Sequence, residues 1–577
     1  MKKLMLGNEA VARGLFEAGC KVVSSYPGTP STEITEYAAK YDEINCEWAP
    51  NEKVGLEVAF GASLGGARAA CCMKHVGLNV AADPMFTMSY TGVNGGLVIC
   101  VADDPGMHSS QNEQDSRHYA EAAKLPMLEP ADSVEAKEFA KLAFELSEEY
   151  DTPVIFRTCT RIAHSQCAVE LCEREDVPSK EYVKNPGKYI MAPANAIKRH
   201  PVVEERCQKL AAFAETTALN RAEMAEDTSL GIITSGTSYQ YVKEVFGDTV
   251  SVLKLGLVNP LPQNLILDFA KKVKRLVVIE ELDPFIENHC KALGLTVDGK
   301  NIFPICGEFS QSLIAKALGK EEKAFAVSDD DIPVRPPVMC AGCPHRGLFY
   351  ILAKKKITVL GDIGCYTLGM APPLNAVDSV LCMGGSVSGV HGFLKASADK
   401  ANKTVAVIGD STFMHSGMTG LANIAYNGTN ATVIIVDNSI TGMTGHQQNP
   451  TTGYNIKGDP ATKIDLEALC HALGINRVRV VDPYDLRETE KVVMEELAAE
   501  EPSVIISRRP CALLKYVKHS PALEVNTEKC RSCKACMKVG CPAIAMKDGK
   551  AHIDATLCVG CGVCKQLCAF DAIGGEN

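Results

Sequence analysis

Eight cysteines between residues 530 and 568 limit the folds that this part of the chain can adopt. They form two runs with one pattern, in which three cysteines are separated by two residues each and a fourth follows. The first run is Cys530, Cys533, Cys536 and Cys541, and the second is Cys558, Cys561, Cys564 and Cys568. Three thiolates at this spacing wrap one face of a [4Fe–4S] cubane. Residues 521–577 are therefore predicted to form a small domain folded around metal clusters.

The repeat implies two similar halves and hence two [4Fe–4S] clusters. In two-cluster ferredoxins the fourth cysteine of each run ligates the other cluster. On this pattern, cluster one takes Cys530, Cys533, Cys536 and Cys568, and cluster two takes Cys558, Cys561, Cys564 and Cys541. The alternative is a pair of zinc knuckles, but zinc sites rarely have this spacing. The longer gap before Cys541 leaves open a distorted or three-iron cluster. The segment thus resembles a ferredoxin-like domain that carries single electrons.

The whole chain has the composition of an ordinary globular protein. With 577 residues, 46% hydrophobic and 22% charged, it is too long for one core and should form three or four domains. Its net charge of −11 gives no basic stripe for nucleic acid. Neither a signal peptide nor a membrane helix of roughly 18 apolar residues is evident. We expect a cytoplasmic protein without membrane or nucleic-acid partners, whose 25 cysteines bind metal or act in catalysis rather than forming disulfides.

Three blocks precede the cysteine-rich domain, and in each block apolar strand-like runs alternate with helical stretches. This alternation is typical of multidomain α/β proteins with parallel sheets. The predicted boundaries are 1–185 for the first block, 186–330 for a polar helical linker with a second block, and 331–515 for the third. The first and third blocks are therefore expected to contain parallel sheets, and the second block to be an α/β domain.

Polar residues follow two strand-like runs of the third block. Gly409 and Asp410 come directly after one run, and Asn438 comes after the next. At the carboxyl ends of adjacent parallel strands, a carboxylate, an amide and a backbone carbonyl can bind Mg²⁺, which prefers oxygen ligands. The spacing resembles the thiamine diphosphate motif, and by that resemblance Asp410, Asn438 and the carbonyl of Ile440 are the Mg²⁺ ligands. A plain turn after a strand is the alternative.

Thiamine chemistry also requires a carboxylate against the aminopyrimidine ring of the cofactor. Glu52 stands at the predicted start of a helix, ahead of an apolar run rich in glycine and alanine. The alternative is a first-turn glutamate stabilised by the helix dipole, which is the commoner role of such a residue. Glu52 is therefore a candidate for the catalytic carboxylate.

One segment of the first block points to a particular enzyme family. Residues 26–30 read Tyr-Pro-Gly-Thr-Pro. They are similar to the Tyr-Pro-x-Thr-Pro segment of the pyruvate and 2-oxoacid:ferredoxin oxidoreductases, in which the threonine contacts the substrate carboxylate. The resemblance implies this role for Thr29. The alternative is a turn bracketed by prolines.

Four cysteines of the third block match positions that hold a cluster beside thiamine in that family. The resemblance begins at the Cys-Ala-Gly-Cys-Pro-His segment and assigns as ligands Cys340, Cys343, Cys365 and Cys511. Ordinary buried thiols are the alternative. The resemblance thus implies a third [4Fe–4S] cluster near thiamine.

The order of the domains is similar to that of the alpha subunits of indolepyruvate:ferredoxin oxidoreductases over essentially the whole chain. That order is a pyrimidine-type thiamine-binding domain, a transketolase C-terminal-like domain, a diphosphate-type thiamine-binding domain and a two-cluster ferredoxin-like domain. The resemblance implies cofactor contacts at His345 and Gly384, and active-site positions for His75 and Arg117. The alternative for the last two is a structural role in loops.

The expected activity is the oxidative decarboxylation of an aryl 2-oxoacid to its acyl-CoA, with coenzyme A as acyl acceptor and ferredoxin as electron acceptor. No segment corresponds to the gamma-type domain of single-chain relatives, so the resemblance implies a separate beta subunit in an α2β2-type complex. One alternative is a relative acting on pyruvate or a branched 2-oxoacid. Others are a non-oxidative thiamine-dependent decarboxylase and an electron-transfer subunit without thiamine.

Overall fold

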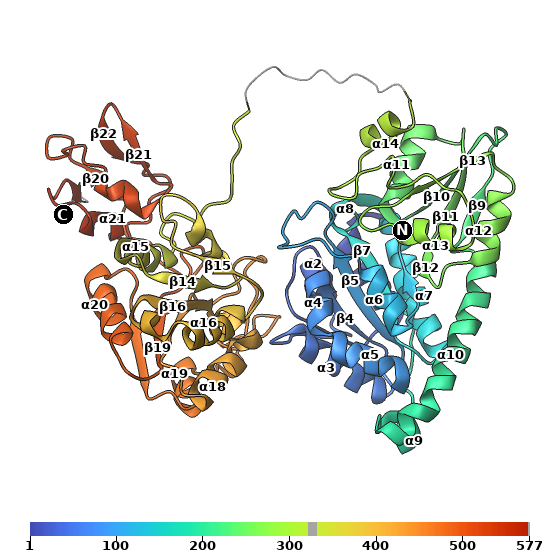
Figure 1. The fold of residues 1–577 in the computed structure, drawn as a ribbon, viewed down its shortest axis with the longest axis horizontal. Helices are drawn as coiled ribbons and strands as arrows, with labels where there is room; N and C mark the ends of the chain where they lie inside the picture. The colour runs from blue at the N-terminus through green and yellow to red at the C-terminus, as the bar shows by residue number, and fades with distance from the viewer. Residues whose placement is uncertain (321–331, 575–577) are drawn as a thin grey trace. The chain divides into compact units, whose positions relative to one another are not determined.

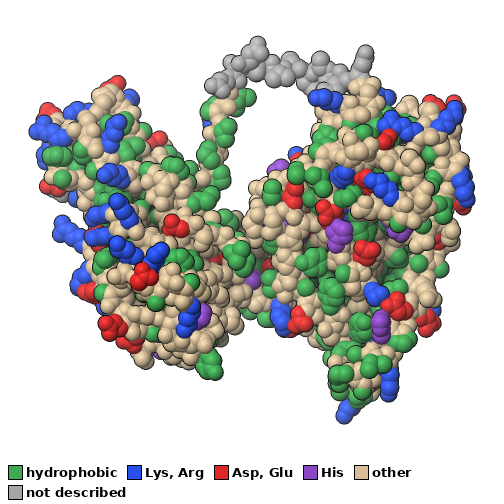
Figure 2. All heavy atoms as spheres, viewed as in Figure 1, with side chains coloured by type: hydrophobic (Ala, Val, Ile, Leu, Met, Phe, Trp, Pro, Cys, Tyr) green, Lys and Arg blue, Asp and Glu red, His purple; other side chains and the backbone are tan. Residues whose placement is uncertain are grey.

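A computed structural model describes residues 1–320 and 332–574 of the chain (Figure 1). The chain divides into two compact units, Met1–Ser328 and Asp329–Asn577. Within the described ranges, no helix has both the length and the apolar character to cross a membrane. On the face shown in Figure 2, acidic and basic side chains are interspersed over the first unit.

The first unit contains a seven-stranded sheet of order β12-β6-β7-β5-β4-β2-β3. All neighbours pair in parallel except β12, which is antiparallel to β6. Its strands are β2 (Val22–Ser25), β3 (Asn45–Trp48), β4 (Ala69–Lys74), β5 (Leu97–Asp103), β6 (Met127–Leu128), β7 (Val154–Cys159) and β12 (Leu257–Asn259). Every residue of β4, β5 and β7 is buried, as expected for parallel strands covered on both faces.

Helices cover both faces of this sheet. On one face, α1 (Gly7–Glu17) and α7 (Ser133–Glu149) pack around Leu15 and Phe144. The other face carries α3 (Glu52–Leu64) and α5 (Ala82–Thr91). A short antiparallel pair, β1 (Lys2–Leu6) with β8 (Gln166–Glu170), flanks the unit.

A second sheet of the first unit has the order β13-β10-β11-β9. Its strands are β9 (Arg221–Glu223), β10 (Leu230–Ser235), β11 (Ser251–Leu255) and β13 (Arg275–Ile279). The stretch expected to be a helical linker contains α10 (Pro193–Thr216). Ile155 of the first sheet shares one apolar cluster with Ile233 and Leu253 of the second. The two blocks therefore have a common core, and β12 adds an edge strand from the second block to the first sheet.

The second unit is built on a six-stranded parallel sheet of order β15-β14-β16-β17-β19-β18. Its strands are β14 (Thr358–Gly361), β15 (Ser379–Val380), β16 (Thr404–Gly409), β17 (Thr432–Asp437), β18 (Arg477–Val481) and β19 (Ser503–Arg508). One face packs against α15 (His345–Lys355) and α20 (Leu486–Leu497), and the other against α16 (Gly385–Ala396) and α18 (Met418–Tyr426).

The cysteine-rich segment follows as a small module of two antiparallel pairs. These are β20 (Glu524–Val525) with β23 (Ile573–Gly574), and β21 (Ile544–Lys547) with β22 (Lys550–Ile553). Its apolar cluster includes Ile351 of α15 and Leu486 of α20. The module is thus packed onto the body of the second unit.

Candidate functional site

Asp410 and Asn438 lie at the same edge of the sheet in the second unit. The strand β16 ends at Gly409 and its parallel neighbour β17 ends at Asp437, with Gly409 opposite Val436. The residue that follows each strand therefore emerges at the carboxyl edge, where ligands bind in open α/β sheets. Gly409 is packed tightly, because a Cβ there would lie 2.6 Å from the ring of Tyr366.

Three oxygen atoms converge at this edge. The side-chain oxygen of Asn438 lies 3.2 Å from Oδ1 of Asp410 and 2.7 Å from the carbonyl oxygen of Ile440. Oxygens this close repel one another unless a cation or a proton lies between them. If the Asn438 amide were rotated, its nitrogen would take the place of its oxygen and donate to both neighbours. Octahedral Mg²⁺ binds oxygens at about 2.0–2.1 Å, which leaves neighbouring ligands about 3 Å apart. The set fits the Mg²⁺ ligands expected from the sequence.

Burial governs the charge of Asp410. Together with the nearby charge of Asp437, burial raises the pKa of Asp410 to about 7. Its Oδ2 accepts hydrogen bonds from Asn449 Nδ2 at 3.2 Å and Thr451 Oγ1 at 3.0 Å. These two bonds orient the carboxylate so that Oδ1 faces the other oxygens. Neither residue follows a strand, so the sequence contained no signal for them.

The loop at Gly384 is shaped by a carboxylate that sequence reasoning missed. Asp362 follows β14 and is fully buried, and it accepts hydrogen bonds from the backbone of Gly384 and Ser386, each at 2.9 Å. Gly384 has φ 82°, and a Cβ there would lie 2.5 Å from the Cβ of Ser416. The loop opens the N-terminus of α16, and such helix ends bind phosphate groups. This geometry fits the cofactor contact expected at Gly384.

His345 lies beside the oxygen set as the first residue of α15. Its Nε2 is 3.5 Å from Nδ2 of Asn438. Burial lowers the pKa of His345 to about 4, so the ring is neutral near pH 7. The structure thus brings the two predicted cofactor residues, His345 and Asn438, together.

The four cysteines of the expected third cluster lie near one another. Burial raises the pKa of Cys343 to about 12 and that of Cys365 to about 11, and neighbouring thiolates of the same set contribute to both shifts. Burial, with a smaller contribution from Cys340, likewise raises the pKa of Cys511. The backbone nitrogen of Cys511 donates a 2.9 Å hydrogen bond to the carbonyl of Asn438. The set therefore adjoins the oxygen site.

Two cavities in the C-terminal module divide its eight cysteines into two sets of four. One, with about 460 Å³ of empty space including open solvent, is lined by Cys541, Cys558, Cys561 and Cys564. The other, with about 360 Å³, is lined by Cys530, Cys533, Cys536 and Cys568. These are the ligand sets expected for clusters two and one, with the fourth cysteine of each run in the opposite cavity. The thiol chemistry and grouping fit two iron–sulfur clusters.

In the first unit, Glu52 is the first residue of α3 and only 4% exposed. Gly77 of α4 (His75–Val80) packs directly on it, since a Cβ there would lie 2.6 Å from Cγ and Oε1 of Glu52. A buried carboxylate at the carboxyl edge of the sheet fits the catalytic role expected for Glu52. Its position also fits the alternative, because a helix N-terminus stabilises a carboxylate.

His75 follows β4 and is 1% exposed. Its Nε2 lies 3.2 Å from the carbonyl of Asn112, while its Nδ1 has no hydrogen-bond partner among the described residues. Burial lowers the pKa of His75, which favours the neutral ring. A buried ring nitrogen without a partner is a candidate contact for a ligand.

Thr29 lies in a polar group that includes a lysine the sequence analysis did not assign. Ser109 Oγ donates to the carbonyl of Thr29 at 3.2 Å, and Lys74 Nζ donates to the carbonyl of Ser109 at 2.6 Å. Burial lowers the pKa of Lys74 to about 8, opposed by the charge of Asp104. Lys74 directly precedes His75 in the chain, which is the signal that could have pointed to it.

Arg117 has a different environment from the one expected of an active-site residue. It is 1% exposed, and its guanidinium pairs with Asp115 and with Glu280, the latter at 2.5 Å. Its Nη2 also donates to the backbone carbonyls of Glu281 and Asp283 at 3.1 Å each. These contacts hold the guanidinium in buried ion pairs and hydrogen bonds, so they support a structural role and give no support to the expected catalytic one.

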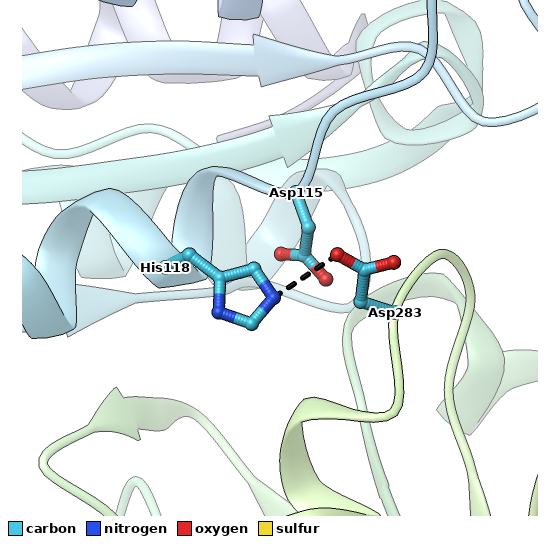
Figure 3. Close-up of side chains that lie close together, drawn as sticks. All are labelled: Asp115, His118 and Asp283. Atoms are coloured by element: carbon cyan, nitrogen blue, oxygen red, sulfur yellow. Dashed lines mark hydrogen bonds and ion pairs between the residues drawn. The ribbon is translucent and has the colours of Figure 1, made fainter.

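Figure 3 shows the carboxylates of Asp115 and Asp283 close to the ring of His118. His118 Nε2 lies 3.0 Å from Asp283 Oδ2. Arg117 already neutralises Asp115, and the Asp115 pKa is held well below its usual range by that charge despite burial. The group is thus accounted for by ion pairs.

Comparisons with known proteins agree with this geometry. Residues 13–227 match the thiamine diphosphate-binding model of pyruvate flavodoxin/ferredoxin oxidoreductases. Residues 362–507 match the C-terminal binding domain of thiamine pyrophosphate enzymes. The indolepyruvate oxidoreductase subunit IorA of Pyrococcus horikoshii is 41% identical, over 99% of this chain and 96% of that protein. The chain belongs to the IorA family of oxidoreductase subunits.

A second IorA relative, from Archaeoglobus fulgidus, is also 41% identical, over 99% of this chain and 97% of its own length. Family membership confirms the resemblance seen in the sequence, and the two models confirm thiamine diphosphate as cofactor and the α/β fold with parallel sheets. A structure of 2-oxoglutarate:ferredoxin oxidoreductase from Magnetococcus marinus aligns loosely, at 19% identity and TM-score 0.48, over 55% of this chain and 65% of that one.

Proposed function

We propose that this chain catalyses the oxidative decarboxylation of an aryl 2-oxoacid, such as indolepyruvate or a phenylpyruvate-type acid. The products are CO₂ and the acyl-CoA, and two electrons leave one at a time through iron–sulfur clusters to ferredoxin. The substrate class rests on family membership, since relatives that are 41% identical are named indolepyruvate oxidoreductase subunits.

A single observation carries the oxidative character of the proposal. The oxygen set of Asp410, Asn438 and Ile440 adjoins a group of four cysteines in the same unit, joined through the 2.9 Å bond from Cys511 to Asn438. When bound, thiamine diphosphate supplies the carbon nucleophile for decarboxylation and a [4Fe–4S] cluster supplies a one-electron acceptor. A non-oxidative decarboxylase has no use for the second group.

Each predicted site residue would have its own role in binding or catalysis. Asp410, Asn438 and the carbonyl of Ile440 hold Mg²⁺, and Gly384 and His345 hold the cofactor near it. Glu52 favours the reactive form of the aminopyrimidine by sharing a proton with it, and Thr29 binds the substrate carboxylate. His75 offers to a bound ligand its Nδ1, which has no hydrogen-bond partner within residues 1–320 and 332–574. The cysteine sets hold one cluster near thiamine and two in the ferredoxin-like C-terminal domain.

The partners follow from the same proposal. The relatives are named as a subunit, which supports a complex of more than one chain. The second chain would be a beta subunit carrying the gamma-type domain, in an α2β2-type assembly. Ferredoxin is the external electron acceptor, and the 2-oxoacid and coenzyme A are the small-molecule substrates. The cytoplasm is the proposed location, because reduced thiols and exposed clusters need a reducing compartment.

Anaerobic turnover tests the proposal. The purified chain, alone and with its candidate beta subunit, is given coenzyme A with indolepyruvate, phenylpyruvate or pyruvate, and ferredoxin reduction is followed. Reduction with the aromatic acids is expected. Turnover with pyruvate alone would overturn the substrate class, and aldehyde release without ferredoxin reduction would overturn the oxidative mechanism.

A further inference from the structure

Arg346 is a buried cation, and no carboxylate of the described residues pairs with it. It is the second residue of α15 and is 4% exposed. Among the residues that the structure describes, no Asp or Glu forms an ion pair with it. A buried charge is costly unless it is paired. The counter-charge of Arg346 must therefore come from something other than a carboxylate.

The guanidinium instead binds the backbone of two cysteine loops. Nε donates to the carbonyl of Cys340 at 3.0 Å, and Nη2 donates to the carbonyl of Met339. On the other side, Nη1 donates to the carbonyl of Val539 at 3.2 Å and to that of Gly540. Arg346 thus joins the loop that begins the thiamine-side cysteine set to the loop that precedes Cys541.

Cysteines of both sets surround this cation. Arg346 and Cys343 line the same cavity as the four cysteines of cluster two. Burial lowers the pKa of Arg346, and the charges of Cys343, Cys541, Cys340 and Cys561 oppose that shift. An arginine remains protonated under such conditions, so its positive charge faces cysteine side chains of both sets.

We propose that Arg346 is a positioning residue between the thiamine-side cluster and cluster two, whose charge raises the reduction potential of both. The proposal rests on the iron–sulfur function proposed above. A cluster held by four thiolates gains one negative charge when it is reduced, and a nearby cation in a buried site stabilises that state. The same hydrogen bonds hold the two ligand loops at a fixed separation.

Close contacts around Arg346 support this second role. Gly342, between Cys340 and Cys343, has φ 65°, and a Cβ there would lie 2.1 Å from Val559 of the C-terminal module. Tyr484 Oη donates to the carbonyl of Gly342 at 2.5 Å. The segment between Cys340 and Cys343 therefore meets Val559, which lies between the cluster-two cysteines Cys558 and Cys561, without room for a side chain between them.

The test is a redox titration of the reconstituted chain followed by electron paramagnetic resonance, with iron and sulfide content measured first. Arg346→Gln removes the charge, and Arg346→Lys keeps it without the planar fork. Arg531→Gln is the control, because the exposed Arg531 lines the cavity of cluster one; it should leave the thiamine-side cluster and cluster two unchanged. Signals are assigned with one Cys→Ser variant per cluster.

Arg346→Gln should shift the thiamine-side cluster and cluster two to more negative potentials and leave cluster one unchanged. Arg346→Lys should stay near the wild-type potentials. An equal shift of all three clusters in R346Q, no shift at all, or a shift in R346K as large as in R346Q would overturn the proposal. R346K remains informative if R346Q loses iron. A wild-type chain without iron would instead overturn the proposed cluster function itself.

Discussion

Arg117 in the first unit and Asp410 in the second are both almost fully buried, yet their surroundings differ in kind. Arg117 pairs with Asp115 and Glu280, and backbone carbonyls fill its remaining contacts. Asp410 has two hydrogen-bond donors on one oxygen, but its other oxygen faces the oxygens of Asn438 and Ile440. Ion pairs and hydrogen bonds within the chain account for the first group, and the second presents converging oxygens that fit a cation.

The difference separates structural from functional burial of charge. A saturated ion-pair network resists change, and removing one member leaves an uncompensated charge. The Asp410 carboxylate instead faces other acceptors, burial and the charge of Asp437 raise its pKa, and a bound cation would stabilise its charged form. Perturbed carboxylates of the second kind are where cofactor chemistry is expected.

The substitution Asp410→Asn is expected to have the greatest effect on cofactor binding. The amide removes the negative charge that Mg²⁺ requires, so affinity for Mg²⁺ with thiamine diphosphate should fall by more than about 100-fold, the upper range for residues that only support a ligand. Turnover should be lost with it. Calorimetric titration of the metal-free chain measures the affinity. The exposed Asp399→Asn is the control and should bind as the wild type does.

Arg117→Met tests whether the buried ion pairs of Arg117 stabilise the first unit. It leaves Asp115 and Glu280 buried without their cation, so the first unit should lose about 3–5 kcal/mol of stability. Thiamine diphosphate binding per folded molecule should be unchanged. Hydrogen exchange of the amides in α6 (Ser116–Ala123) reports the local loss. Arg275→Met breaks the half-exposed pair with Asp298 and should cost less than about 1 kcal/mol. Equal losses in both variants would contradict the structural role.

Gly77→Ala tests whether the buried carboxylate of Glu52 takes part in cofactor chemistry. The new methyl group would meet the Glu52 carboxylate at 2.6 Å and displace it. If Glu52 shares a proton with the cofactor, deuterium exchange at the thiazolium C2 should slow about 10²-fold, within the range for general acid–base catalysis. Gly61→Ala is the matched control in α3, since a Cβ there meets nothing within 4 Å. Normal exchange in G77A would remove Glu52 from the site.

The sequence predicted the sites whose residues follow strands or repeat at fixed spacing. Asp410 and Asn438 lie near each other as expected, because the ends of neighbouring parallel strands share an edge of the sheet. The cysteines of the C-terminal module fall into the two expected sets, because three cysteines two residues apart must converge. The roles of these residues remain predictions until they are measured.

What the sequence could not predict depends on contacts between distant segments. Arg117 lies in a segment that resembles an active-site loop, but its partner Glu280 is 163 residues away. Asp362 looks like an ordinary residue after a strand until its bonds to the Gly384 loop are seen. Arg346 follows a motif cysteine by three positions, yet its contact with Gly540 is 194 residues away. Only the fold reveals such pairings.

The smallest expected effect is the pH dependence of metal binding. Burial and the charge of Asp437 raise the Asp410 pKa to about 7 in the folded chain, against about 3.9 when unfolded. Between these values the folded, metal-free chain holds a proton that the unfolded chain lacks, so its stability falls as pH rises through this window. Metal needs the carboxylate, so affinity for Mn²⁺, which takes similar oxygen ligands, should rise up to about tenfold per pH unit and level off above pH 7.

Mn²⁺ binding to the chain without thiamine diphosphate, followed by electron paramagnetic resonance, measures this dependence, because the cofactor's own phosphates then do not titrate. D410N provides the background from other sites. His345 adds little in this range, since its pKa of about 4 keeps it neutral. A flat profile from pH 5.5 to 7.5 would mean that Asp410 is already ionised without metal. In that case the converging oxygens would need another explanation, such as an Asn438 amide turned to donate to both of its neighbours.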